Sequence, residues 1–254
     1  MKYHFLASYL PEIHREDRRV KFGLSDMISE RFHIADRDWR EVDLVLLRGD
    51  VIIVERILAG LTPIPGPSLH PPGFWRDQIK SPAEGPEFIL DFLRGPGTEP
   101  VGPSDRDRFY AAYFEHVLAE SESQLLRGFV GLEWDLRNVQ AAVRARRRGL
   151  EPASVVVGAG ETVEALGASR AEDFGLASER KWLERVLAAK TPDDVQAVHE
   201  IVLWDYLEES IGMDPFNFSV ILAYILKIQI LEKRLALSEE TGLEVLRKLE
   251  AREA

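Results

Sequence analysis

The sequence predicts an all-α protein: duplicated long helical hairpins with a proline-rich loop and at most a short N-terminal strand. Apolar residues recur at helical spacing along most of the 254 residues. Prolines and glycines gather between residues 61 and 103, where they separate helical segments. The chain also matches itself when it is shifted by ninety residues, which indicates that one helical unit occurs twice.

Residues 1–103 are expected to form an N-terminal helical region with a proline-rich loop. Tyr3–Leu10 alternates loosely and ends before a proline, which favours a short strand or an extended arm. A weak helix is expected from Ser25. A stronger helix is expected to start at Asp36–Asp38 and to run to Leu58, and Gly49-Asp50 marks a place where it could break or kink.

The proline-rich loop covers Leu61–Pro86, where repeated prolines are expected to exclude any helix. Phe74 and Trp75 form a hydrophobic anchor within it. The favoured interpretation is that they staple the loop onto the hairpins, and the alternative is that they are presented to a partner. A short helix is expected over Glu87–Leu93.

Residues 104–150 are expected to form the first hairpin. Ser104 is the expected N-cap, and the helical pattern continues to about Arg148 with a bend near Gly128 and Gly131. Since serine is a favoured N-cap residue and acidic residues follow it, this start is supported by the helix dipole as well.

Residues 151–190 are expected to connect the hairpins. They contain a β-prone break at Pro152–Gly160 and two helical stretches, Glu161–Leu166 and Glu172–Ala189. The break and the short helices indicate a linker region between two larger units.

Residues 191–254 are expected to form the second hairpin. Thr191-Pro192 carries a capping residue followed by proline at the first helical position. Gly212–Pro215 is expected to end that helix. The next helix should run to about Leu237, and Ser238 should start the last one.

The internal repeat rests on matched residues at one constant offset. The clearest pairs are Phe114 with Trp204, Glu115 with Asp205, Trp134 with Tyr224, Arg137 with Lys227, and Arg144 with Arg234. The repeat core is expected to contain Trp134, Leu136, Tyr224 and Leu226. Because such a unit buries its apolar face against a neighbour, repetition favours a scaffold that presents a surface.

Composition excludes several classes of protein. The chain has no cysteine, which excludes disulfides and thiolate zinc sites and favours the cytoplasm. No signal peptide or membrane span is expected, because charges interrupt every apolar run. A net charge of −11 disfavours nucleic-acid binding. The exception is the basic cluster Arg144–Arg148, which is expected to be a solvated helix end.

Motifs for catalysis, cofactors and metals are incomplete, so no catalytic, cofactor-binding or metal-binding residue is predicted. His199-Glu200 begins like a zinc-protease helix, but Leu203 stands where the second histidine is needed. Val155–Gly160 resembles the start of a dinucleotide-binding loop, but Val163 replaces the third glycine. A small-molecule enzyme or ligand-binding protein with a cleft near Gly158–Gly160 is the alternative function.

Charged residues within the long helices have two interpretations. Glu133 and Arg137 are four residues apart, in the order that supports a helix. The favoured interpretation is a surface ion pair. The alternative is a polar contact buried between hairpins that fixes their register.

The two ends of the chain resemble a known group of proteins. Phe5-Leu6-Ala7-Ser8-Tyr9-Leu10-Pro11 resembles the opening of an uncharacterised helical family encoded in bacterial V-type ATPase operons. Leu222–Lys227, with its continuation to Arg234, is similar to the closing helix of that family. It is also similar to the terminal helices of the C subunit of V/A-type ATPases, which in eukaryotes is the d subunit.

This resemblance implies a non-catalytic, all-helical protein that docks the central stalk to the membrane rotor ring or assists its assembly. Its partners would be the central-stalk and rotor-ring subunits. It would be cytoplasmic, peripheral to the membrane through these partners only, and would bind no nucleic acid. The residues expected to bind partners are Phe74, Trp75, Arg144, Arg147 and Arg148.

Overall fold

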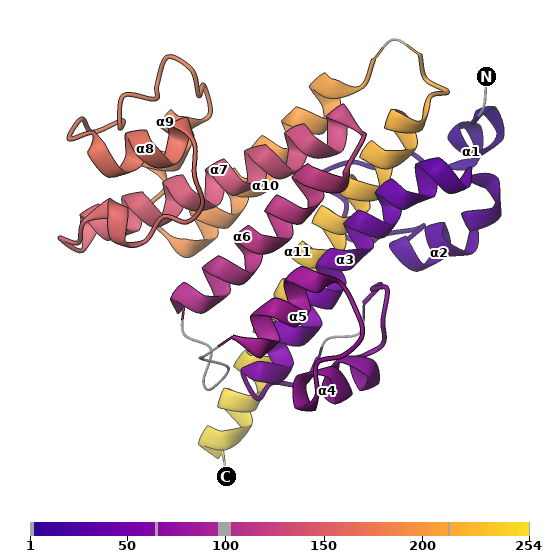
Figure 1. Cartoon of the computed structure of the whole chain (residues 1–254), viewed down its shortest axis with the longest axis horizontal. Coiled ribbons are helices and arrows are strands. Elements are labelled where there is room, and N and C mark those ends of the chain that lie inside the picture. Colours follow the sequence, from indigo (N-terminus) through magenta and orange to yellow (C-terminus); the bar gives the residue numbers. More distant parts are fainter. Residues whose placement is uncertain (1–2, 64–65, 96–102, 213, 254) are drawn as a thin grey trace. The chain divides into compact units, whose positions relative to one another are not determined.

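The computed structural model is all-helical over the residues that it describes, which confirms the predicted fold class (Figure 1). It describes residues 3–63, 66–95, 103–212 and 214–253, and only the backbone of residues 103–104 and 238–253. Within these ranges the helices are α1 His4–Tyr9, α2 Leu24–Ser29, α3 Asp36–Leu58, α4 Pro72–Lys80, α5 Glu87–Arg94, α6 Pro103–Glu120, α7 Gln124–Arg147, α8 Glu161–Ala168, α9 Leu183–Ala188, α10 Pro192–Ser210 and α11 Phe218–Glu253. Two short 3₁₀ helices are η1 Arg31–His33 and η2 Pro152–Ser154.

The chain divides into two compact units. The terminal unit combines Met1–Val42 with Leu207–Ala254, and the central unit is Asp43–Tyr206. Helices α3 and α10 each contribute residues to both. Among the described helices, none is both long enough and apolar enough to cross a membrane.

In the terminal unit, the segment predicted as a strand or extended arm is instead helix α1. The prediction was wrong because Tyr3 and Leu6, three residues apart, are both buried, which is the spacing of a helical face. The Tyr3 hydroxyl also contacts the carboxylate of Asp38, and this contact fixes the start of the segment. Helix α1 packs against α11, as does α2.

Helix α11 provides the apolar core of the terminal unit. Ile221, Leu226 and Leu231 are all buried. The predicted end near Leu237 and new start at Ser238 were wrong, since one helix continues to Glu253. A serine inside a helix costs only about 0.5 kcal/mol relative to alanine, so a cap-like sequence does not by itself end a helix.

In the central unit, the long helical pattern from Ser104 to Arg148 is two antiparallel helices, α6 and α7. The turn lies at residues 121–123, not at Gly128 or Gly131. Ser123 is the N-cap of α7, and its hydroxyl accepts a hydrogen bond of 3.2 Å from the amide of Leu126. The apolar periodicity continues from one helix to the next across this short turn, so the turn could not be predicted from the sequence pattern.

The proline-rich segment contains helix α4, although repeated prolines were expected to exclude one. Pro72 stands at its first turn, where the missing backbone N–H costs no hydrogen bond. The helix predicted over Glu87–Leu93 is present as α5.

The region predicted to connect two hairpins is helical in part. Helix α8 was predicted, but the stretch predicted as helical from Glu172 is a series of turns until α9 begins. Phe174 and Gly175 have left-handed φ angles of 56° and 74°, which no α-helix accepts. The predicted start of α10 is confirmed, because the Thr191 hydroxyl accepts a hydrogen bond from the Asp194 amide at 3.1 Å.

Candidate functional site

Buried charges of the central unit form an ion cluster around Glu133 of α7. Its carboxylate is 1% exposed and is held by both Nη atoms of Arg48 on α3, at 2.6 Å each. Arg137 Nε lies 3.6 Å away, one turn along α7. His199 Nε2 on α10 lies 3.8 Å away. The cluster therefore joins α3, α7 and α10, and we call these four residues the Glu133 cluster.

Electrostatics keep Glu133 and Arg48 charged. Burial raises the pKa of Glu133, but Arg48, His199 and Arg137 outweigh burial and hold its pKa well below the ordinary value of 4.5. Burial disfavours the charged form of Arg48 as well, but the Glu133 carboxylate more than offsets this effect. The pKa of Arg48 is therefore raised. A carboxylate with so low a pKa is a weak base at neutral pH. The arrangement suits a structural tie between helices more than acid–base catalysis.

Glu133 and Arg137 were predicted to form a surface ion pair, and that prediction was wrong. The ion pair exists, but Glu133 is buried and its main partner is Arg48. Arg137 also lies 4.1 Å above the ring of Tyr110. Burial raises the pKa of Tyr110 to about 12, so its hydroxyl stays neutral and donates to Glu55 at 3.1 Å.

A second buried carboxylate, Asp50, attaches the proline-rich segment to α3. It is fully buried and accepts hydrogen bonds from the backbone amides of Leu69 (2.8 Å) and His70 (2.9 Å) and from Trp75 Nε1 (2.7 Å). The residues predicted to break or kink α3 thus lie within an unbroken helix. A Cβ on Gly49 would be 2.2 Å from the carbonyl oxygen of Pro67, so glycine is needed for the close approach.

The predicted anchor residues differ from each other. Trp75 is fully buried, presents no surface, and lies in α4. Phe74 is half-buried and stacks on the His70 ring at 4.3 Å between centroids. The structure therefore gives Trp75 the contacts that a staple needs.

The basic end of α7 is only partly solvated. Arg146 donates to the carbonyls of the loop 169–171, and its guanidinium lies 3.5 Å above the ring of the buried Phe174. Arg147 donates to a backbone carbonyl of α9 at 2.9 Å. Arg144 and Arg148, the other two arginines predicted to bind partners, are exposed.

The glycine turn predicted to be a ligand loop is packed onto α7. Trp134 Nε1 and Asn138 Nδ2 both donate to the carbonyl of Val157, at 3.1 and 3.0 Å. A Cβ on Gly158 would be 2.1 Å from the Trp134 indole, so this face of the turn is occupied by the protein itself. The hollow beside it, between α6, α7 and this turn, has a volume of about 10 Å³, room for about one water molecule.

The four residues predicted to form the repeat core differ in burial. Leu136 and Leu226 are buried, whereas Trp134 and Tyr224 are half-buried. Among the described residues, no group of three or more histidine, aspartate or glutamate side chains is arranged to hold a metal ion.

Comparison with known proteins yields one finding. The family model described as "Protein of unknown function (DUF2764)" matches residues 73–252, which is more than half of the chain. No curated protein and no solved structure matches the chain.

Proposed function

The chain belongs to the DUF2764 family of proteins of unknown function, and we propose that it is a non-catalytic V-type ATPase-associated protein that docks the central stalk to the membrane rotor ring or assists its assembly. In this role it resembles the C subunit of V/A-type ATPases and lies at the cytoplasmic membrane face through its partners. The proposal joins the likeness of the chain ends to that C subunit with the helix arrangement described above.

The observation that carries the proposal is the agreement of helix bounds at the ninety-residue offset. Shifted by ninety, α6 covers 193–210, and α10 covers Pro192–Ser210. The turn after α6 falls on the turn after α10, and α11 begins four residues after the shifted start of α7. This agreement supports a duplicated hairpin, the kind of unit from which the ATPase C subunit is built.

Burial at the offset gives further support. Phe114 and Trp204 are both buried, as are Val117 and Leu207. These pairs place an aromatic residue and an aliphatic residue three positions apart on the buried face of α6 and again of α10. A helical scaffold of this kind acts through its surfaces, in agreement with a docking protein.

Co-purification tests the proposal directly. An affinity tag on a central-stalk component of the V-type ATPase should recover this chain in a fixed ratio to the stalk. Deleting its gene should leave ATP hydrolysis by the catalytic head but reduce ion pumping, because the stalk would lose its seat on the ring. A pure complex that retains stalk and ring, pumps ions normally and lacks this chain would refute the proposal.

The alternative, a small-molecule enzyme or binding protein using the turn near Gly158–Gly160, has less support. The Trp134 indole lies where a Cβ on Gly158 would be, so the protein itself covers this face of the turn. A thermal-shift screen with nucleotides and phosphorylated metabolites separates the two functions. A ligand present at one hundred times its Kd should add about 2.7 kcal/mol of stability, and a clear shift would favour the alternative.

A further inference from the structure

The segment from Leu10 to Gly23 joins helices α1 and α2 on the surface of the terminal unit. We call residues 10–23 the strap. None of its residues is buried, whereas Leu6 before it and Leu24 after it are only 1% and 2% exposed. The strap consists of turns, bends and irregular backbone. A segment without a buried side chain has little local stability of its own.

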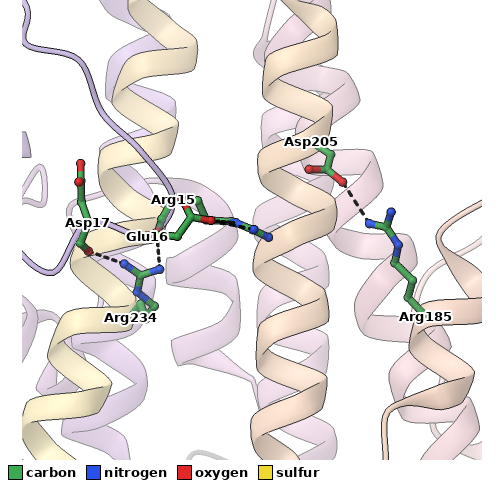
Figure 2. A network of polar contacts seen from close by, with 6 residues as sticks. All are labelled: Arg15, Glu16, Asp17, Arg185, Asp205 and Arg234. Atoms are coloured by element: carbon green, nitrogen blue, oxygen red, sulfur yellow. Dashed lines mark hydrogen bonds and ion pairs between the residues drawn. The ribbon is translucent and has the colours of Figure 1, made fainter.

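Helix α11 holds the strap through polar contacts. The Arg234 guanidinium donates to the carbonyl oxygens of Arg15 and Asp17, at 2.6 Å for the second (Figure 2). Where the strap ends, the Glu232 carboxylate accepts the Leu24 amide at 2.9 Å. Because the Arg234 contacts use only backbone atoms of the strap, they do not depend on its side chains. Arg234 therefore holds the middle of the strap, and Glu232 holds the residue that follows it.

The packing of the strap onto Tyr224 of α11 is incomplete. A hollow lined by strap residues and Tyr224 has a volume of about 10 Å³, room for about one water molecule. The Tyr224 hydroxyl makes no hydrogen bond with any part of the chain that the structure describes. Phe22, the largest apolar side chain of the strap, is half-buried against the ring of Tyr9, which is itself 53% exposed. The strap therefore covers Tyr224 without an apolar anchor.

The matching position of the central unit is covered in a different way. Trp134 of α7, which matches Tyr224 at the ninety-residue offset, donates its indole N–H to the Val157 carbonyl at 3.1 Å. Helix α8 and η2 pack on α7, and α8 contributes the fully buried Leu166. This cover is therefore attached through a core side chain, whereas the strap is attached through hydrogen bonds.

We propose that the strap is a releasable cover, and that Arg234 controls its opening over the Tyr224 face of α11. In the closed state, the guanidinium holds the strap over this face. In the open state, the strap moves away while the buried Leu6 and Leu24 keep its two ends in place and α11 stays helical. A segment without buried side chains opens at a lower free energy than the whole domain unfolds. The inference goes beyond the proposed function, because the opening requires no partner.

Thiol labelling of the full chain measures the opening. Since the chain has no cysteine, Tyr224→Cys places a single thiol under the strap, and a maleimide in native buffer should label it at a rate proportional to the open population. Adding Arg234→Gln should raise this rate roughly 10- to 100-fold, because the strap loses hydrogen bonds from a charged donor. The matched control is Arg185→Gln, which removes an arginine that pairs with Asp205 at 3.1 Å in the central unit (Figure 2). The control should leave the rate unchanged.

Hydrogen exchange on the same variants distinguishes release of the strap from unfolding. In Arg234→Gln, the amides of residues 11–22 should exchange faster, while those of residues 221–231 in α11 keep their wild-type protection. Arg234→Lys keeps the charge but not the forked guanidinium, so it is the milder variant and should give an intermediate labelling rate. The proposal is wrong if neither variant changes the labelling rate, if Arg185→Gln raises it as much, or if α11 loses its protection in both Arg234 variants.

Discussion

Replacing Glu133 by Gln is expected to destabilise the central unit more than any single surface substitution. In the wild-type protein, both Nη atoms of Arg48 lie 2.6 Å from an oxygen of the Glu133 carboxylate. The substitution leaves this guanidinium buried opposite a neutral amide. Removing one partner of a buried ion pair costs roughly 3–5 kcal/mol. The side chains are 1% and 9% exposed, so solvent screening reduces this value little.

Urea unfolding measures the effect. The free energy of unfolding of Glu133→Gln is compared with that of Arg137→Gln, whose guanidinium lies 3.6 Å from the same carboxylate and is partly exposed. This control should cost only about 1 kcal/mol. A third variant, Arg48→Met with Glu133→Leu, removes both charges. It should recover most of the loss, because an apolar replacement of a buried ion pair is often close to neutral.

The prediction is wrong if Glu133→Gln costs less than about 1 kcal/mol, the value of an exposed pair. It is equally refuted if the Arg137 control costs as much as the Glu133 variant. Either result would mean that Arg48 is solvated or paired in another way in solution, and the cluster would not tie the three helices.

Because the pKa of Glu133 is lowered in the folded protein, its contribution to stability is complete above about pH 4.5, the unfolded value, and is lost as the pH falls further. The difference in free energy of unfolding between wild type and Glu133→Gln should therefore become smaller as the pH is lowered below about 4.5. A difference that grows would contradict a lowered pKa for Glu133. Trp75→Ala should cost roughly 3–5 kcal/mol as a core deletion, and Phe74→Ala much less, measured by thermal unfolding; equal effects would argue against the staple. Gly49→Ala should cost about 1–3 kcal/mol because the neighbouring backbone must move, whereas Gly131→Ala, with nothing within 4 Å of the added Cβ, should stabilise by about 0.5–1 kcal/mol.

Helix existence could be predicted from the sequence because periodicity and capping are local properties. The start of α10 could be predicted from two adjacent residues, Thr191 and Pro192. Both hydrogen bonds of its capping box are present: the Asp194 amide donates to the Thr191 hydroxyl, and the Thr191 amide donates to the Asp194 carboxylate. The turn between α6 and α7 and the length of α11 were not predictable in this way. At residues 121–123 no proline or glycine marks the turn, and at Ser238 a typical cap residue lies within a continuing helix.

The Glu133 cluster escaped prediction because ion pairing between helices depends on tertiary contact. A signal was nevertheless present on each helix. Arg48 lies three residues from the buried Val45 and Val51, and Glu133 three residues from Val130 and Leu136, which are also buried. A single charge in the middle of an apolar face is costly unless a partner meets it. The positions of Arg48 and Glu133 on apolar helix faces therefore predict that these two opposite charges pair with each other. The spacing of Glu133 and Arg137 along one helix does not predict this pairing.

Two of the glycines expected to break or bend the long helices, Gly49 and Gly128, have a different role, which bears on how the central unit is assembled. A glycine inside a helix costs about 1 kcal/mol relative to alanine, so its presence calls for a compensating contact. At Gly49 the Pro67 carbonyl occupies the place of the Cβ. At Gly128 the Tyr206 hydroxyl occupies it and donates a hydrogen bond of 3.1 Å to the Leu125 carbonyl. Both glycines thus mark the points where another segment reaches the helix backbone. Since these contacts and the Glu133 cluster fix α3, α7 and α10 within the central unit, the buried polar groups that make them are committed to architecture.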